Sequence, residues 1–178
     1  ETLVVLSQIH AGASLDTIRA RILDEDLLQK TTRVTRQGIW EEIRGRYLVN
    51  DRILAPLASL VNRSQNRADA RLSLFYEFCL AEALLRDTTL HGVYPRYLAG
   101  FSGVGKSDIQ KFFDELSLQS PEIADWSPQT RGKVVSNILS ILRDFGLLEG
   151  TQRKTFARLY VPLPAFVYVL YRLRDDGL

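Results

Sequence analysis

Residues 100–107 form the most recognisable chemical motif of the chain, GFSGVGKS, which matches the phosphate-binding pattern G-x-x-x-x-G-K-[ST]. In that pattern glycine amides surround the phosphates, the lysine (here Lys106) reaches them, and the hydroxyl (here Ser107) binds Mg²⁺. This chemistry requires a buried β-strand directly before the loop. The preceding residues instead contain Pro95 and an adjacent arginine, which a buried strand disfavours. We therefore expect a glycine loop in which Ser107 caps a helix that begins at Asp108, with no nucleotide cofactor.

Other side chains that could support catalysis or bind a metal form no recognisable constellation. Three acidic pairs stand in charged contexts that would not separate the pKa values of their members: Asp24/Asp26, Glu41/Glu42 and Asp175/Asp176. Two histidines, His10 and His91, and the single cysteine Cys79 are too few for a structural zinc site. We expect a protein with no catalytic activity, no cofactor and no metal.

Basic residues are concentrated in two segments, although the whole chain carries a formal charge of only +2. Residues 129–158 contain six basic and two acidic residues, and residues 30–46 contain five basic and two acidic residues. The two segments therefore carry +4 and +3, so the remainder of the chain is negative. Positive charge that is gathered in this way indicates local contacts with the phosphates of a nucleic acid.

The stretch from Trp126 to Pro162 predicts a helix followed by a β-hairpin. Ser127 is a suitable N-cap, Pro128 fits the first helical turn, and Gly146 fits a left-handed C-cap. Apolar residues recur at helical spacing between these caps. Two short strand-like runs then flank a polar turn at residues 149–154. A helix followed by a hairpin wing is typical of a winged helix, which binds DNA.

The polar side of this helix and the hairpin supply candidate nucleic-acid contacts. Side chains suited to phosphates and base edges are Gln129, Arg131, Lys133, Asn137, Arg153, Lys154 and Arg158. The turn Gln152-Arg153-Lys154 is the sharper prediction, because solvent-seeking side chains at a hairpin tip have little packing role. The alternative is a packed amphipathic helix and a hairpin whose outer faces meet only water.

A second basic element is expected near the N-terminus. Ser14 can cap a helix with one apolar face, and a further helix is expected from about Arg33 to Leu48 after a short polar connection. Two helices joined by a short turn, the second rich in arginine, match a helix-turn-helix. Its candidate DNA contacts are Arg33, Arg36, Arg44 and Arg46. A helical hairpin with a solvated face is the alternative.

These elements together predict a mainly α fold. We expect a helical bundle with a helix-turn-helix-like N-terminal part and a C-terminal winged-helix-like element that carries a small β-hairpin. The predicted division is an N-terminal helical part, residues 1–62, and a central helix with the winged-helix-like part, residues 63–178, within one compact unit. Residues 87–98 are expected to be a connector.

The compartment follows from cysteine content and hydropathy. A single cysteine excludes an internal disulfide and fits a reducing cytoplasm. The most apolar tail, residues 160–173, is too short to span a bilayer. We therefore expect a cytoplasmic protein that makes no membrane contact.

Two parts of the chain resemble the BrxA family of bacterial BREX phage-defence operons. They are DLLQKTTRVTRQGIWEEIRGRYL, residues 26–48, and DIQKFFDEL with ADWSPQTRGKVVSNILSILRDFGLLEG, within residues 108–150. The more specific motifs are the Leu-Leu-Gln-Lys turn before an arginine-bearing helix and the entry at residues 126–130 to a helix ending in Asp-x-Gly-Leu-Leu. The resemblance covers most of the chain. It implies a small, mostly helical, cytoplasmic accessory protein that binds double-stranded DNA without catalytic activity of its own.

Residues and resemblance together predict a non-enzymatic protein that binds double-stranded DNA. Its C-terminal helix would enter or lie along the major groove, while the hairpin holds flanking phosphates and the N-terminal arginines extend the basic track. The expected partners are double-stranded DNA and other BREX proteins, and a homo-oligomer is compatible with this interpretation. Three alternatives remain open: a protein–protein adaptor, an RNA-binding helical module, and a nucleotide-dependent switch at residues 100–107.

Overall fold

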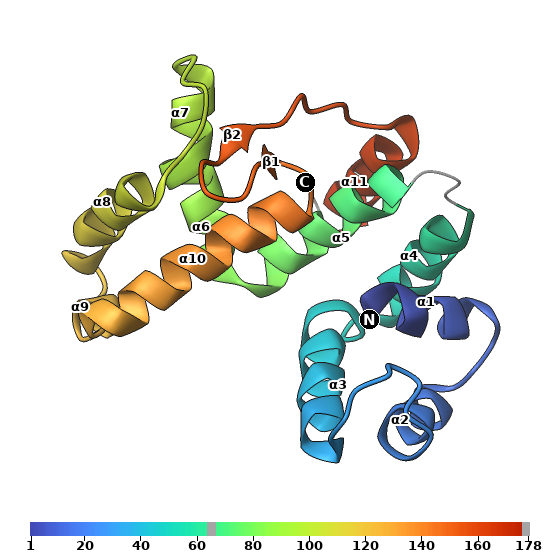
Figure 1. The fold of residues 1–178 in the computed structure, drawn as a ribbon. Coiled ribbons are helices and arrows are strands. Elements are labelled where there is room, and N and C mark those ends of the chain that lie inside the picture. Colours follow the sequence, from blue (N-terminus) through green and yellow to red (C-terminus); the bar gives the residue numbers. More distant parts are fainter. Residues whose placement is uncertain (64–66, 176–178) are drawn as a thin grey trace. The chain divides into compact units, whose positions relative to one another are not determined.

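The computed structural model describes residues 1–63 and 67–175, and it is mainly α-helical with one small β-hairpin (Figure 1). The predicted mainly α class with a small hairpin is therefore confirmed. Contacts between elements divide the chain into two compact units. Unit 1 comprises residues 1–81 together with the chain from residue 161 onward, and unit 2 comprises residues 82–160.

Unit 1 is built from helices, two of which begin at a side-chain cap. Its helices are α1 (Thr2–His10), α2 (Leu15–Asp24), α3 (Arg33–Tyr47), α4 (Asp51–Arg63), α5 (Arg67–Ala81) and α11 (Leu163–Asp175). Ser14 caps α2 by accepting the N–H of Thr17 at 3.2 Å, and Thr32 caps α3 by accepting the N–H of Thr35 at 3.1 Å. The two helices that were predicted for a helix-turn-helix are therefore present at the expected positions, and α2 packs against α3.

The core of the N-terminal helices is formed by the apolar face of each. Helix α1 packs mainly against α4 and also against α2. Leu6, Ile18, Ile22 and Leu57 are fully shielded from solvent. Burying side chains of this size stabilises the unit by about 1.5–3 kcal/mol each, so this small cluster fixes how the helices pack.

A buried polar network joins α5 to α11. The carboxylate of Glu77 accepts one hydrogen bond from the Tyr168 hydroxyl at 2.7 Å and another from Nε of Arg172 at 2.8 Å. All three residues are buried, and burial raises the pKa of Tyr168, as does the neighbouring carboxylate, so the phenol keeps its proton and donates. Because α5 also packs against α3 and α4, the contacts group α5 and α11 with the N-terminal helices. The sequence-based division places its boundary earlier, after residue 62.

Unit 2 contains the remaining helices and the hairpin. Its elements are α6 (Ala83–Asp87), the π-helical turn η1 (Thr88–Val93), α7 (Tyr94–Leu98), α8 (Lys106–Ser117), α9 (Pro121–Ala124), α10 (Pro128–Asp144), β1 (Leu148–Glu149) and β2 (Thr155–Phe156). The expectation of a connector at residues 87–98 was wrong, because this stretch is helical. Pro95 stands in the first turn of α7, directly after the π-helical turn η1.

Helix α10 begins and ends where its sequence predicts. The Ser127 side chain accepts the N–H of Thr130 at 3.1 Å, with Pro128 at the first helical position. At the other end Gly146 adopts a φ of +81°, which few residues other than glycine tolerate. The N–H of Leu147 then bonds back to the carbonyl of Leu142 at 2.9 Å, which closes the helix in the manner of a Schellman motif.

The core of unit 2 lies between α10 and α8, which pack against each other. The buried side of α10 consists of Val135, Ile138, Leu139 and Leu142. On α8, Phe113 is fully buried and its ring meets that of Trp126 edge-on, with centroids 5.9 Å apart. This packing leaves the opposite side of α10 to the solvent and fixes its position relative to the hairpin, because β1 also contacts α10.

Candidate nucleic-acid interface

The side of α10 that faces away from the core presents three of the predicted nucleic-acid residues. Gln129, Lys133 and Asn137 are exposed, and their four-residue spacing places them along one side of the helix. Ser136 and Ser140 flank this row, and each hydroxyl donates to a carbonyl one turn earlier at 2.9 Å. The helix therefore offers a ligand one ammonium group and two side-chain amides in a line.

Arg131 does not join this row. Two residues along a helix correspond to a rotation of about 200°, so Arg131 lies on the other side of α10 from Gln129. Its guanidinium forms an ion pair with Asp114 on α8 at 2.5 Å and also donates to the carbonyl of Ile123 at 3.3 Å. The arginine is half-buried and holds α8, α9 and α10 together.

The hairpin loop differs from the expectation of solvent-seeking side chains at its tip. Lys154 is 9% exposed, and its ammonium group donates to the carbonyls of Gly150 and Thr151, both at 2.7 Å. The tight turn, in which Gly150 has a φ of +87°, leaves these carbonyls for Lys154 to satisfy. Lys154 therefore folds back to hold the loop, and the expectation that it projects into solvent was wrong.

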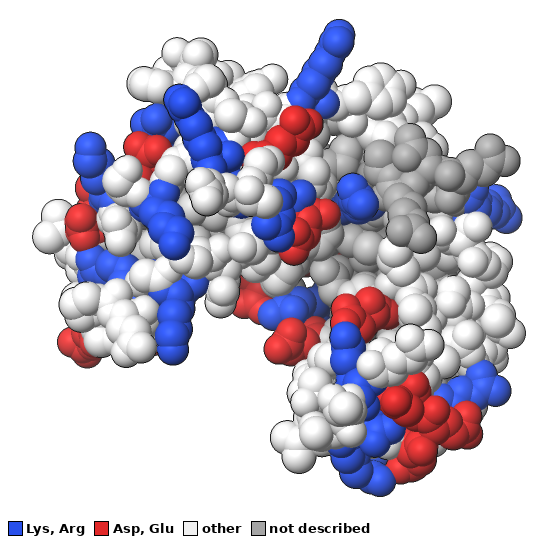
Figure 2. All heavy atoms as spheres, viewed as in Figure 1, with Lys and Arg blue, Asp and Glu red and all other residues white. Residues whose placement is uncertain are grey.

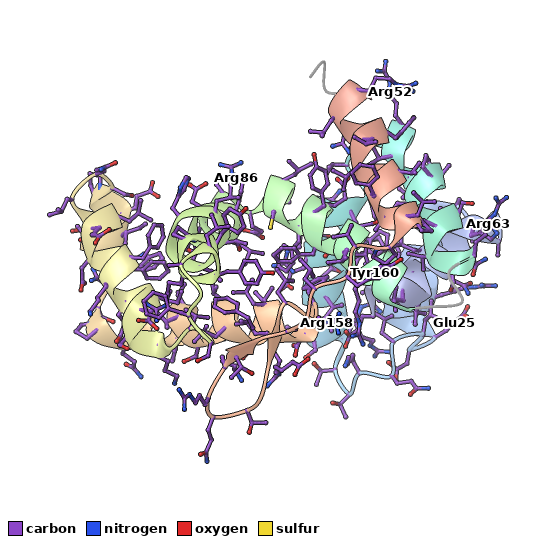
Figure 3. The ribbon with its side chains drawn as sticks, turned by 90° about the horizontal axis from the view of Figure 1, so that it is seen from above. Glu25, Arg52, Arg63, Arg86, Arg158 and Tyr160 are labelled. Atoms are coloured by element: carbon purple, nitrogen blue, oxygen red, sulfur yellow. The ribbon has the colours of Figure 1, made fainter. Side chains whose placement is uncertain are left out.

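Arg153 and Arg158 are the exposed basic residues of the hairpin region. Arg153 lies in the loop between β1 and β2. Arg158 lies on the segment that follows β2 (Figure 3). Neither forms an ion pair with another residue that the structure describes. Arg153 and Arg158 can therefore contact an anionic partner, whereas the ammonium group of Lys154 is engaged by loop carbonyls.

Residues 102–104 of the GFSGVGKS segment pair with the hairpin through an isolated bridge, and we call this short segment the third strand. Gly103 forms an isolated antiparallel bridge with Thr155, the N–H of Val104 donates to the carbonyl of Lys154 at 3.1 Å, and the N–H of Phe156 donates to the carbonyl of Ser102 at 3.0 Å. A Cβ at position 103 would lie 2.0 Å from the Lys154 carbonyl oxygen, so this close approach requires glycine. The segment runs along β2, with β1 on the other side of β2.

The other two glycines of the motif also have structural roles. Gly100 adopts a φ of +77° after α7, and Gly105 is the N-cap residue of α8. The carboxylate of Asp108 accepts the N–H of Gly105 at 2.7 Å. The expectation that Ser107 caps a helix beginning at Asp108 was wrong, because α8 already begins at Lys106 and Asp108 provides the cap.

A cleft of about 680 Å³ lies between this third strand, α10 and the hairpin loop. Its walls are residues 101–106, the side of α10 at residues 136–143, and residues 151–154. Its basic lining residues are Arg96, Lys106, Arg143, Arg153 and Lys154, whereas its acidic lining residue is Asp108. Sequence reasoning missed Arg96 and Arg143 and considered Lys106 only as a nucleotide ligand. The sequence signals for this cleft were Lys106 in the glycine-rich motif and the predicted contacts Arg153 and Lys154.

The predicted N-terminal contacts on α3 are all engaged with carboxylates. The pairs are Arg33 with Asp24 at 2.6 Å, Arg36 with Asp26 at 3.6 Å, Arg44 with Glu41 at 2.9 Å and Arg46 with Glu42 at 3.0 Å. Arg46 also lies over the ring of Phe78 on α5, 4.3 Å from its centroid. Basic and acidic side chains accordingly lie against one another in this part of the surface (Figure 2). The positive charge of this element is therefore largely balanced within unit 1.

Two further properties of the described ranges, residues 1–63 and 67–175, bear on the kind of site. They contain no group of three or more His, Cys, Asp or Glu side chains that could hold a metal ion. No helix in these ranges is both long and apolar enough to cross a membrane.

Comparisons with known proteins agree with this architecture. An uncharacterized protein from Magnetospirillum magneticum, solved by crystallography, is similar in fold, with a TM-score of 0.78. The alignment covers 98% of this chain and 87% of that chain at 16% sequence identity. A search of functionally curated proteins found no match. The model of the BrxA family matches residues 1–169, nearly the whole chain. The chain therefore belongs to the BrxA family, which implies that it is a component of a BREX phage-defence system.

Proposed function

We propose that this protein is a non-enzymatic accessory of its BREX system that binds double-stranded DNA through α10 and the neighbouring hairpin. The observation that carries the proposal is the exposed row Gln129, Lys133 and Asn137 on a helix that is rigidly packed on its other side. A helix fits the major groove of B-DNA, where amide side chains can bond adenine and basic side chains can bond guanine or phosphate.

The order of elements in unit 2 supports the same function. Helical residues 83–98 are followed by the short strand at Gly103, then α8, the four-residue helix α9, α10 and the hairpin. Apart from the short α9, this is the order of a winged helix (helix, strand, two helices, hairpin), in which α10 would be the recognition helix and residues 150–154 the wing. In that arrangement the second helix of the helix-turn-helix enters the groove, and Arg153 would contact a flanking phosphate.

The arginines of α3 enter the proposal as secondary contacts. Each is paired with a carboxylate, so binding a phosphate would require an exchange of partners. Exposed ion pairs contribute only about 0–1 kcal/mol, and such an exchange is therefore feasible for Arg33 and Arg44, which are the more exposed of the four. Arg36 and Arg46 are more buried and are expected to contribute least.

A protein–protein adaptor is the second candidate function, and one feature of α11 favours it. Leu163, Phe166, Val167 and Leu170 are each about half exposed or more and follow the spacing i, i+3, i+4, i+7 of one helix face. An apolar row of this kind on a surface is typical of a site for another protein. The adaptor function would rest on unit 1, and the DNA-binding function rests on unit 2.

The proposal is tested by duplex binding of a variant of the α10 row. We expect Lys133→Gln combined with Asn137→Ala to weaken binding of a fluorescent DNA duplex at low salt by at least about tenfold, because each lost groove contact is worth about 1–3 kcal/mol. The matched control is Lys111→Gln combined with Gln110→Ala, an exposed amine and amide on α8. An equal loss of duplex affinity in both variants would show that this side of α10 does not contact the DNA.

An RNA duplex of the same sequence distinguishes the alternatives in the same assay. Preference for DNA supports the proposal, whereas preference for RNA would replace it with the RNA-binding alternative. No duplex affinity at low salt would overturn DNA binding and leave the adaptor function, which predicts co-purification with other BREX proteins.

A further inference from the structure

We infer that the cleft between the third strand, α10 and the hairpin loop is a phosphate-binding site in its own right, with Lys106 and Arg143 as contacts that the α10 row does not include. For the phosphate of a DNA backbone the inference rests on the proposed function. For a free polyphosphate it stands independently. The cleft, of about 680 Å³, is within the range of natural small-ligand sites and is large enough for more than one phosphate group.

The walls of the cleft are held in place before any ligand arrives. The strand wall is fixed by backbone hydrogen bonds from Val104 and Phe156. The loop wall is fixed by Lys154, whose ammonium group bonds two loop carbonyls. The third wall is the C-terminal half of α10, which is anchored by its buried side. A rigid concave site loses little conformational entropy when it binds a ligand.

The charge of the lining indicates an anionic ligand. The acidic lining residue Asp108 is already engaged by Arg96 at 3.2 Å and by the N–H of Gly105 at 2.7 Å. Among the described residues, Arg143 forms an ion pair with the exposed Asp144 alone. Lys106 and Arg153 form no ion pair within the described part of the chain. Several cations around one concave surface add to the same positive electrostatic potential. Lysine and arginine together form a common phosphate-binding set.

The geometry favours phosphate held by side chains over a Mg-nucleotide held by a glycine loop. The close approach of Gly103 to the Lys154 carbonyl uses that glycine for strand pairing. The N–H of Gly105, which would face a nucleotide phosphate in the sequence motif, is bonded to the carboxylate of Asp108 instead. That negative charge at the start of α8 opposes a polyphosphate seated on the helix end. A phosphodiester that passes over the cations avoids this repulsion.

The test compares two double variants of the full chain. Lys106→Gln with Arg143→Gln removes the two cleft cations. Lys111→Gln with Arg86→Gln is the matched control, because Lys111 is an exposed lysine on the same helix and Arg86 pairs with its neighbour Asp87 as Arg143 does with Asp144. Arg86 projects on the opposite side of unit 2 from the hairpin loop (Figure 3). Thermal unfolding verifies that both variants are folded, and Lys106→Gln alone serves if the double variant is not.

Each variant is titrated with a DNA duplex and, separately, with inorganic tripolyphosphate. For the duplex we expect the cleft variant to bind at least several-fold more weakly than the control. We also expect the cleft variant to have a shallower negative slope of log affinity against log salt. The magnitude of the slope should fall by up to about two, because each lost phosphate contact removes about 0.9. Cleft and control variants that bind both ligands equally well would overturn the inference.

The two ligands separate this inference from the proposed function. If the wild-type protein binds the duplex and the two variants bind it equally well, the proposed function stands. The cleft is then not part of the DNA-binding surface. The wild-type protein could instead bind tripolyphosphate but no duplex, with only the cleft variant losing tripolyphosphate binding. That result would retain the cleft as a phosphate site and overturn DNA binding. Failure of the wild-type protein to bind either ligand would overturn both.

Discussion

Lys154 is the single side chain on which the shape of the hairpin loop most depends. Its ammonium group satisfies two carbonyls that the turn leaves without partners, and its stem is buried. Arg153, one residue earlier, is exposed. Two adjacent basic residues therefore have different roles: one maintains the loop and the other is presented by it.

Lys154→Ala is expected to destabilise the protein by about 1–3 kcal/mol, because hydrogen bonds from a charged donor contribute about 1.5–3 kcal/mol and the two carbonyls would lose their partner. Arg153→Ala is the matched control and should change the free energy of unfolding by less than about 0.5 kcal/mol. Urea unfolding measures both. Similar values for the two variants would show that Lys154 does not stabilise the loop.

Tyr168 gives the stability of unit 1 a dependence on alkaline pH. Burial raises the pKa of Tyr168 in the folded state, whereas an unfolded tyrosine has a pKa of about 10. The unfolded state therefore binds fewer protons than the folded state above that pH, so the free energy of unfolding falls as the pH rises. We expect Tyr168→Phe to show a shallower decline above about pH 10 than the wild-type protein. An identical decline in both would contradict the assigned role of the phenol.

At the scale of elements, the third strand depends on the absence of a side chain at Gly103. A Cβ there would lie 2.0 Å from the Lys154 carbonyl oxygen and 2.9 Å from Cα of Thr155. We expect Gly103→Ala to separate the strand from β2 and to destabilise the protein by about 1–3 kcal/mol.

Gly132→Ala is the natural comparison, because a Cβ at this helical position of α10 meets nothing within 4 Å. Alanine is the better helix former by about 0.5–1 kcal/mol, so this variant should be stabilised. Thermal unfolding of the two variants should move in opposite directions. A Gly103→Ala variant as stable as the wild-type protein would show that glycine at 103 is not needed for strand pairing.

Elements that depend on neighbouring residues could be predicted from the sequence. The start of α10 at Ser127 and its end at Gly146 are encoded by local capping chemistry. The pairing of Gly103 with Thr155 joins residues that are distant in the chain, and so does the contact of Glu77 with Tyr168. No local pattern reports such contacts. Helical geometry alone would have separated Arg131 from Gln129, because they differ by about 200° around the axis.

At the scale of the whole molecule, the two basic segments differ in how their charge is balanced. The arginines of α3 in unit 1 are all paired with carboxylates. In unit 2, Lys106, Lys133, Arg153 and Arg158 form no ion pair with another described residue. The formal charges of the two segments, +4 and +3, are similar. The segments differ in the ion pairs that their basic side chains form. We therefore assign the larger share of any electrostatic binding to unit 2.

The central claim is tested most directly by the salt dependence of DNA binding by the wild-type chain. If Arg143 and these four cations of unit 2 each contact a phosphate, the slope of log affinity against log salt should be roughly −4 to −5, since each contact contributes about −0.9. Fluorescence anisotropy with a short DNA duplex over a series of salt concentrations measures this slope. No measurable affinity at low salt, or a slope near zero, would contradict the claim that unit 2 binds the DNA backbone.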